Sequence, residues 1–133
     1  MKWAEVAALY RYPVKSMLGE RLTSVEITDR GLTGDRRFAL VDEETGRIAG
    51  AKSPRLWREL LRCTGPTAQV DADTVQFGSA SPPSTFFDFA PVHLITVSTL
   101  ARIAALSPRG TAEAARYRPN LVIVTGDGEP PPQ

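Results

Sequence analysis

Tyr12-Pro13-Val14-Lys15-Ser16 places a lysine and a serine directly after a proline. Pro13 fixes one backbone angle and so stiffens the approach to both side chains. A later segment leads two arginines into an alternating run typical of a β-strand, Gly34-Asp35-Arg36-Arg37-Phe38-Ala39-Leu40-Val41-Asp42. Cationic groups and a hydroxyl at rigid strand ends suit an oxyanion, so the two segments predict a site for phosphate, a carboxylate or an anionic cofactor.

Composition and charge restrict the class of protein. The 133 residues suit one domain or two small fused lobes, and 42% hydrophobic residues are enough to build a core. A net charge of +1 gives no general attraction for nucleic acid. The lone Cys63 fits a reducing compartment. No apolar run reaches the ~20 residues that span a bilayer, and no signal peptide is evident, so we expect a soluble cytoplasmic protein without a membrane partner.

Residues 1–50 are rich in short predicted strands. Alternating side chains indicate strands at 3–10, 22–27 and 38–41, although Leu9 blurs the first pattern. Glu43-Glu44-Thr45-Gly46 has the composition of a hairpin turn into residues 47–49. Several short strands at close spacing predict a small barrel or a strongly curled sheet.

The rest of the chain mixes helices and strands. A helix capped by Ser53, with Pro54 first and an apolar face of Leu56, Leu60 and Leu61, is expected to end near residues 63–66. A hairpin at 67–77 and a linker at 78–85 follow. A strand at 91–96 leads into a helix that Thr96 or Ser98 caps and residues 108–110 break. Residues 121–124 indicate a strand buried on both faces, and the tail from residue 126 is expected to fray.

Several common chemistries are excluded by the motifs. The chain has no P-loop, no GxGxxG segment that opens a helix and no HExxH. One histidine and one cysteine are too few for a zinc cluster, so no metal site is predicted. Cys63 is expected to be a small buried thiol, and His93 a hydrogen-bonded histidine in the core or at an edge. No catalytic residue follows from these patterns.

Two arginine-containing strings are candidates for ligand contacts. In a strand, Arg36 would share a face with Phe38 while Arg37 points to the other side, and Asp35 would form a local salt bridge with one of them. Before residues 121–124, Arg118 and Asn120 would share a side of an extended segment. Such a pair suits a flat heteroaromatic ligand that carries a phosphate, and the alternative is a string that merely terminates a strand.

These residues together resemble a known family. The first part resembles the N-terminal β-barrel domain of MOSC (molybdenum cofactor sulfurase C-terminal) proteins in Tyr12-Pro13-Val14-Lys15-Ser16, in Gly31-Leu32-x-Gly34-Asp35-Arg36-x-Phe38-x-Leu40-Val41-Asp42 and in Ala51-Lys52-x-Pro54-Arg55-Leu56. The third part resembles the start of the MOSC domain itself in Phe87-Asp88-x-Ala90-Pro91-Val92-His93-Leu94-Ile95-Thr96 and Tyr117-Arg118-Pro119-Asn120-Leu121-Val122. The mitochondrial amidoxime-reducing component and its bacterial relatives belong to this family.

The resemblance implies binding of the molybdenum cofactor, an anionic pterin (molybdopterin) with a phosphate tail. It places Arg36 and Arg118 on the phosphate, Lys15 and Ser16 over the pterin, and Asn120 at its edge. It also assigns three residues to a polar strand-to-helix segment that lines the cofactor: Asp88, Thr96 and Ser98. Molybdenum ion binding, pyridoxal phosphate binding and oxidoreductase or sulfur-transfer activity are further properties that it implies.

The expected fold is mixed α/β and β-rich, with a few short helices. It has a small MOSC N-terminal β-barrel lobe at 1–78 and a shortened, partial MOSC-like β-barrel lobe at 79–133. The family's catalytic cysteine, a thiolate ligand of molybdenum, lies beyond the string that contains Asn120, and Cys63 matches no motif. The chain therefore resembles a member that lacks the C-terminal half.

Two alternatives to an enzyme remain open. One is a non-catalytic module that uses the same pocket to bind a pterin or another anion. The other is an interaction module, a homodimer or a complex in which a second chain completes the truncated sheet.

Overall fold

The protein is described by a computed structural model, which covers residues 3–64, 85–87 and 89–126. The chain divides into two compact units. The terminal unit comprises Met1–Tyr10, Arg21–Ser24 and Val92–Gln133, and the central unit comprises Arg11–Glu20 and Val25–Pro91. The predicted hairpin at 67–77, nearly all of the linker at 78–85, the tail after Gly126 and the boundary between residues 78 and 79 lie outside the described residues, so the predicted division into domains stays a prediction.

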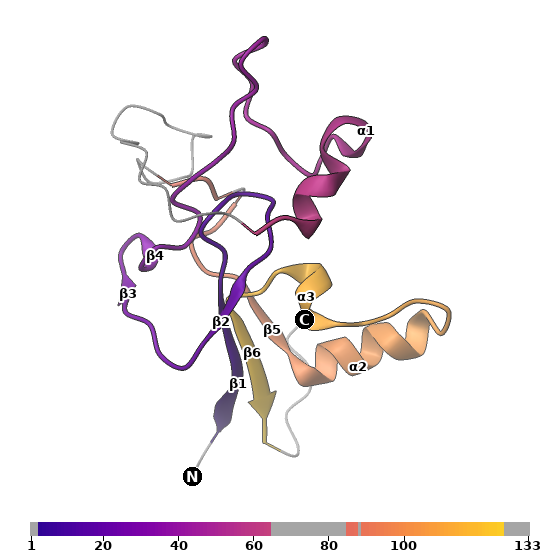
Figure 1. The fold of residues 1–133 in the computed structure, drawn as a ribbon. Helices are drawn as coiled ribbons and strands as arrows, with labels where there is room; N and C mark the ends of the chain where they lie inside the picture. The colour runs from indigo at the N-terminus through magenta and orange to yellow at the C-terminus, as the bar shows by residue number, and fades with distance from the viewer. Residues whose placement is uncertain (1–2, 65–84, 88, 127–133) are drawn as a thin grey trace. The chain divides into compact units, whose positions relative to one another are not determined.

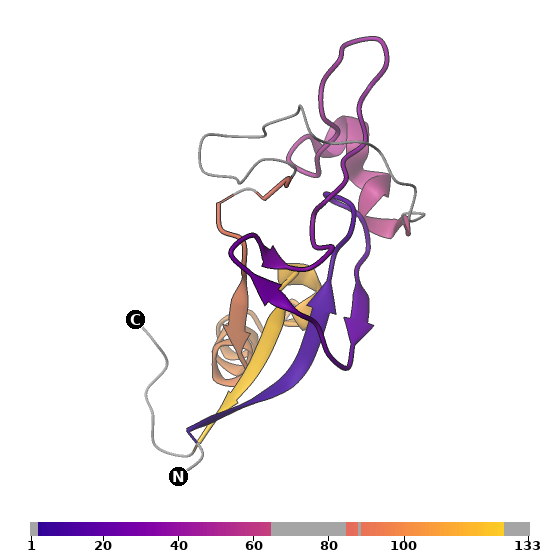
Figure 2. The same ribbon diagram turned by 90° about the vertical axis from the view of Figure 1, so that its left-hand side faces the viewer.

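A four-stranded sheet with the order β2-β1-β6-β5 organises the terminal unit. It contains β1 (Ala4–Arg11), β2 (Glu20–Leu22), β5 (Leu94–Thr96) and β6 (Leu121–Thr125). β6 lies between β1, to which it is antiparallel, and β5, to which it is parallel. The helix α2 (Val97–Leu106) packs against β5 and β6, as Figure 1 shows, and the same strands run side by side in Figure 2.

The residues of β1 explain why its sequence pattern is blurred. The pairing with β6 shifts register between Val6 and Ala8, so Ala7 is an extra residue in the ladder. A β-bulge of this kind changes which side chains share a face. The alternation that Leu9 interrupts is therefore two short patterns separated by a bulge.

Burial of β6 differs from the sequence prediction. Val122 is buried, but Val124 is 44% exposed. Val124 lies towards the strand end and pairs with the exposed Glu5 on β1. The expectation of burial on both faces is therefore wrong at this end of the strand.

Local signals set the limits of α2. Thr96 has an extended backbone, and its side chain accepts a hydrogen bond from the backbone N–H of Thr99 at 3.0 Å, which is N-cap geometry. At the other end, the N–H of Ser107 donates to Ile103, and that of Gly110 donates to Ser107. Of the two predicted caps, Thr96 or Ser98, the structure shows Thr96, and the predicted break at residues 108–110 is confirmed.

The central unit contains a two-stranded sheet, a hairpin and a short helical segment. The strands β3 (Ile27–Thr28) and β4 (Gly31–Leu32) are antiparallel. The single strand predicted at 22–27 is wrong, because β2 ends at Leu22 and β3 begins at Ile27. At 38–41, isolated bridges join Phe38 to Val14 and Val41 to Ile48 in place of a continuous strand. The hairpin turn is confirmed, since the N–H groups of Asp42 and Gly46 donate to Arg47 and Asp42 respectively.

The helical segment is shorter than predicted. α1 (Pro54–Trp57) is followed directly by the 3₁₀ helix η1 (Arg58–Arg62), and Ser53 makes no side-chain cap. Leu60 is buried, whereas Leu56 is 76% exposed and Leu61 is also exposed, so the predicted apolar face is wrong for both. Because the segment makes one α-turn and then tightens, side chains at helical spacing do not share one face.

The core of the central unit is small. Its buried cluster contains Val14, Met17, Ala49 and Leu60, with Phe38 and Trp57 packed against it. In the described residues, the strands form an open sheet and a two-stranded sheet, and no closed barrel is seen. The β-rich mixed fold with a few short helices is confirmed. None of the helices within the described ranges is long and apolar enough to cross a membrane.

Candidate functional site

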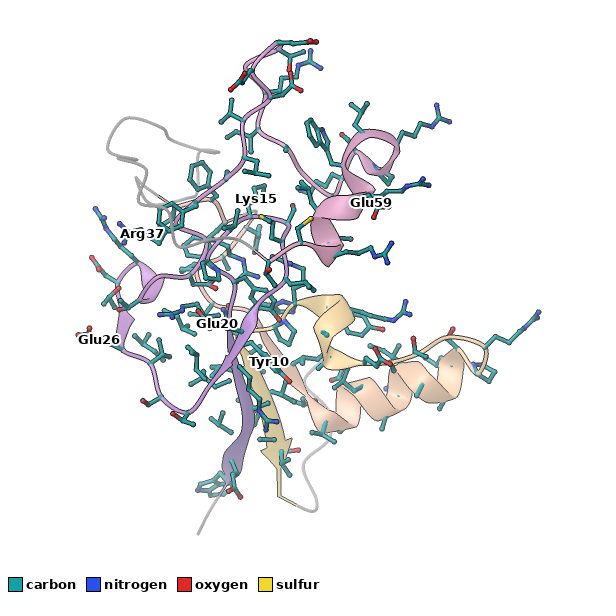
Figure 3. The ribbon with its side chains drawn as sticks, in the orientation of Figure 1. Tyr10, Lys15, Glu20, Glu26, Arg37 and Glu59 are labelled. Atoms are coloured by element: carbon teal, nitrogen blue, oxygen red, sulfur yellow. The ribbon has the colours of Figure 1, made fainter. Side chains whose placement is uncertain are left out.

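The two segments singled out in the sequence meet in the central unit. The N–H of Lys15 donates to the carbonyl of Phe38 at 2.8 Å, and the N–H of Phe38 donates to the carbonyl of Pro13 at 3.0 Å. This parallel bridge, centred on Val14, places the proline-lysine segment beside the residues that follow Arg36. Lys15 lies in the interior of the central unit and Arg37 at its periphery (Figure 3).

Arg36 is held in a turn that precedes Phe38. Its φ is 46°, in the left-handed region that few non-glycine residues adopt. Its N–H donates to the carbonyl of Tyr12 at 2.7 Å. The prediction that Arg36 and Phe38 share one face of a strand is wrong, because the left-handed turn interrupts the alternation.

The side chain of Arg36 has two further contacts. Its Nη1 donates a short hydrogen bond to Oδ2 of Asp35, which forms an ion pair, and its guanidinium lies over the ring of Tyr12, 4.7 Å from the ring centre. The other oxygen of Asp35, Oδ1, accepts from the N–H of Tyr12 at 2.7 Å. The predicted local salt bridge of Asp35 is confirmed, and Arg36 is its partner.

Phe86 links the two cationic residues. Its N–H donates to the carbonyl of Arg36 at 2.8 Å, and its own carbonyl accepts from Nζ of Lys15 at 3.4 Å. Lys15 is 8% exposed, and the neighbouring Thr85 and Phe87 are buried. One peptide segment therefore holds the ammonium of Lys15 and the backbone of Arg36 in a fixed relation.

Ser16 also has a left-handed backbone, with a φ of 63°. Its Oγ accepts from the N–H of Ala51 at 3.1 Å, which connects the lysine segment to the start of the helical region. A hydroxyl that accepts one hydrogen bond still carries its own hydrogen as a donor. The hydroxyl of Ser16 is thus bonded to the segment at Ala51, whereas Lys15 and Arg36 are joined through Phe86.

The remaining predicted site residues that are described lie in the terminal unit. Thr96 is buried, and its Oγ1 lies 2.9 Å from Oγ of Ser98 and 2.8 Å from Oγ1 of Thr99. Arg118 ends α3 (Ala114–Tyr117) with a φ of 51°. This left-handed conformation contradicts the expected extended segment in which Arg118 and Asn120 share a side. Asp88 lies outside the described residues.

Asn120 connects the strands on either side of β6. Its Oδ1 accepts from the N–H of His93 at 3.0 Å, and its Nδ2 donates to the carbonyl of Tyr10 at 3.2 Å. Its backbone N–H donates to His93 and its carbonyl accepts from Tyr10. Asn120 is 1% exposed, so this amide is an internal link of the sheet.

Neither Cys63 nor His93 is buried. The thiol of Cys63 is exposed and donates to the carbonyl of Glu59 at 3.3 Å, so the expected buried thiol is wrong. His93 is exposed next to β5, which agrees with the edge alternative and excludes the core one. The described ranges contain no group of three or more His, Cys, Asp or Glu side chains that could hold a metal ion.

Sequence reasoning missed the parts of the network that hold the cations. Tyr12 belongs to the segment that contains Lys15, but nothing in the sequence indicates that its ring contacts the guanidinium of Arg36. Phe86 lies 71 residues from Lys15, and no local pattern indicates such a contact. The sequence therefore identified the charged groups, and the structure added the residues that orient them.

Comparison with known families covers the central unit and the N-terminal strands of the terminal unit. The family model described as MOSC N-terminal beta barrel domain matches residues 3–90. The matched range contains Lys15, Ser16 and Arg36 and ends before Thr96. No curated protein and no solved structure gives a significant match to the chain.

Proposed function

The chain belongs to the family of MOSC N-terminal beta barrel domains, and on this premise we propose that it binds a molybdopterin-type cofactor through its phosphate-bearing end. Arg36 would supply positive charge for the phosphate, and Lys15 and Ser16, which the resemblance places over the pterin, would add an ammonium and a hydroxyl beside it. The protein would act within an oxidoreductase of the kind represented by the amidoxime-reducing component, or in sulfur transfer.

One observation carries this proposal. The peptide of Phe86 bonds to Nζ of Lys15 and to the backbone of Arg36, within the range that the family model matches. A cationic side chain, and the backbone that carries a second one, are both held by this residue, and such preorganised groups can bind an oxyanion with little loss of conformational freedom. The donor chemistry of Lys15, Ser16 and Arg36 fits the phosphate end of the cofactor.

The family resemblance also assigns Arg118 to the phosphate and Thr96, Ser98 and Asp88 to the pterin, and these assignments stay predictions. Asn120 would have to share its amide between the pterin edge and its bonds to Tyr10 and His93.

The metal end is a separate question. A bound molybdenum cofactor supplies two-electron redox chemistry, whereas the residues named here bind and orient its organic part. The thiol of Cys63 donates to Glu59, and we name no residue of this chain as a ligand of molybdenum.

The proposal is tested by the molybdenum and pterin content of the protein purified without reconstitution. Metal analysis and the fluorescence of the oxidised pterin are compared for the wild type, Lys15→Ala and Arg36→Ala. Arg55→Ala, in the exposed helix α1, is the control for a lost positive charge. Pyridoxal phosphate, a second phosphorylated cofactor implied for the family, serves as a competing ligand.

We expect pterin to copurify with the wild type and with Arg55→Ala, and to fall at least about tenfold in the other two variants, a loss of about 1.4 kcal/mol in binding free energy. Equal pterin content in all four proteins would remove the site assignment. Preferential retention of pyridoxal phosphate would change the identity of the cofactor.

An interaction module is the second candidate function, and the position of β5 favours it. β5 is an edge strand of the four-stranded sheet in the described residues, and an edge strand offers unpaired backbone groups to another chain. A second copy that completes the sheet would give a dimer mass in light scattering. A monomer at all concentrations would exclude the homodimer.

A further inference from the structure

We infer that Asp35 and Tyr12 are positioning residues, which orient the guanidinium of Arg36 for an oxyanion. This inference rests on the proposed function, because it concerns the same cationic site. It assigns a role to the acidic residue of the Gly34-Asp35-Arg36 segment and to the aromatic residue that precedes Pro13.

The burial of Asp35 is the first observation. Its side chain is fully buried, at 0% exposure, and a buried carboxylate is costly unless it is paired and hydrogen-bonded. Both oxygens have partners, Oδ1 with the N–H of Tyr12 and Oδ2 with Nη1 of Arg36. The carboxylate therefore connects the backbone at Tyr12 directly to the guanidinium of Arg36.

The guanidinium is restrained in two directions. Asp35 accepts from Nη1, while the central carbon of the guanidinium lies over the ring of Tyr12, 4.7 Å from the ring centre. Contacts with two different groups restrain the position of the guanidinium more than either contact does alone. A guanidinium has five N–H donors in a rigid fork, so fixing the group sets the direction of all of them.

The backbone adds a third restraint. The N–H of Arg36 donates to the carbonyl of Tyr12, and the N–H of Tyr12 donates to Asp35. Tyr12 is thus bonded on both sides to the turn that carries Arg36. Orienting a side chain before the ligand arrives reduces the entropy that binding costs.

Electrostatics alone makes the opposite prediction, which allows a sharp test. The negative charge of Asp35 offsets the positive charge of Arg36, so removing it should strengthen the attraction for an anion. If Asp35 orients Arg36, removing its charge should weaken binding instead. Asp35→Asn separates the two cases, because Asn retains an oxygen that accepts from Tyr12 but loses the charged partner of Arg36.

The experiment measures binding of inorganic phosphate to the full chain by NMR, with the Nε–Hε signals of the arginines as the readout. The variants are Asp35→Asn, Arg36→Ala and the double variant, each checked for folding by circular dichroism. Tyr12→Leu and Tyr12→Phe form a second pair, in which only the Phe variant keeps the aromatic ring. This pair tests the inference even if Asp35→Asn does not fold.

We expect Asp35→Asn to weaken phosphate binding about tenfold and to have no further effect once Arg36 is Ala, because its effect passes through the guanidinium. Tyr12→Phe should bind more tightly than Tyr12→Leu. Tighter or unchanged binding in a folded Asp35→Asn protein overturns the inference, as does a loss that persists without Arg36.

Failure of the proposed function gives a different pattern. If Arg36→Ala binds phosphate as the wild type does, or if the wild type binds none, the anion site is wrong and the inference falls with it. If Arg36→Ala loses binding while Asp35→Asn and Tyr12→Leu keep it, the site stands and only the positioning role is rejected.

Discussion

Asn120 and His93 hold each other through two hydrogen bonds. Oδ1 of Asn120 accepts from the N–H of His93 at 3.0 Å, and the N–H of Asn120 donates to the carbonyl of His93 at 2.7 Å. The same side chain reaches Tyr10 at the far side of β6. One amide therefore joins the two strands that flank the central strand of the sheet.

Asn120→Ala should lower the free energy of unfolding by about 1–3 kcal/mol, because the N–H of His93 and the carbonyl of Tyr10 lose their partner in the buried side chain of Asn120. Urea unfolding measures the change. Thr111→Ala, at an exposed position, is the control and should change stability by less than about 0.5 kcal/mol. An equal effect of both substitutions would show that the amide is not a structural link.

Asp35→Ala should be far more destabilising than Glu20→Ala. Asp35 is fully buried and its partner Arg36 is 13% exposed, whereas Arg11 and Glu20 are 29% and 46% exposed in their own ion pair. Removing one partner of a buried pair costs roughly 3–5 kcal/mol, and an exposed pair contributes about 0–1 kcal/mol. The fluorescence of Trp57, which packs on the core of the central unit, reports unfolding in both variants. Similar losses in the two would contradict the assigned burial.

Gly31→Ala should destabilise the protein more than Gly46→Ala. Both glycines have positive φ, 89° and 67°, so both substitutions strain the backbone by roughly 1 kcal/mol. A Cβ at Gly31 would also collide with the carbonyl oxygen of Pro91, while a Cβ at Gly46 meets nothing within 4 Å. The difference in melting temperature between the two variants isolates the collision. Equal melting temperatures would mean that Pro91 does not lie against Gly31.

The pKa of Asp42 is lowered, first by the hydrogen bond from the hydroxyl of Thr45 and then by the backbone N–H of Thr45. A lowered pKa in the folded state means that this carboxylate contributes stability above its unfolded pKa, and that the contribution is lost as the pH falls through the folded pKa. Thr45→Ala should therefore raise the pKa of Asp42 towards its ordinary value, and Thr45→Ser should keep it low. An NMR titration of the Asp42 carboxyl measures both, and an unchanged value in Thr45→Ala would exclude the hydroxyl as the cause.

Short-range features could be predicted from the sequence. The cap of α2 by Thr96 involves Thr99, three residues away, and the hairpin turn at residues 43–46 closes between Asp42 and Arg47. Such interactions depend on neighbours in the chain, so residue type and spacing are sufficient to indicate them. One short-range prediction was wrong, because Ser53 precedes α1 but its side chain does not cap the helix.

In the candidate site, too, the sequence predicted the local features and missed those that depend on tertiary contacts. The charges of Lys15 and Arg36 and the salt bridge of Asp35 were evident, because they concern adjacent residues or a recognisable segment. The left-handed turns at Arg36 and Arg118 were not, because arginine rarely adopts this conformation and tertiary bonds stabilise it where it does.

By itself, the sequence determined a β-rich mixed fold and membership of the MOSC N-terminal family, and it identified the cationic side chains that we propose for an anion site. Only the tertiary structure decided what holds these groups in place, such as Phe86 between Lys15 and Arg36, or Asn120 between Tyr10 and His93. The reason is physical: these partners lie 27 to 110 residues apart in the chain, so they meet only in the folded protein, where buried polar groups are generally hydrogen-bonded.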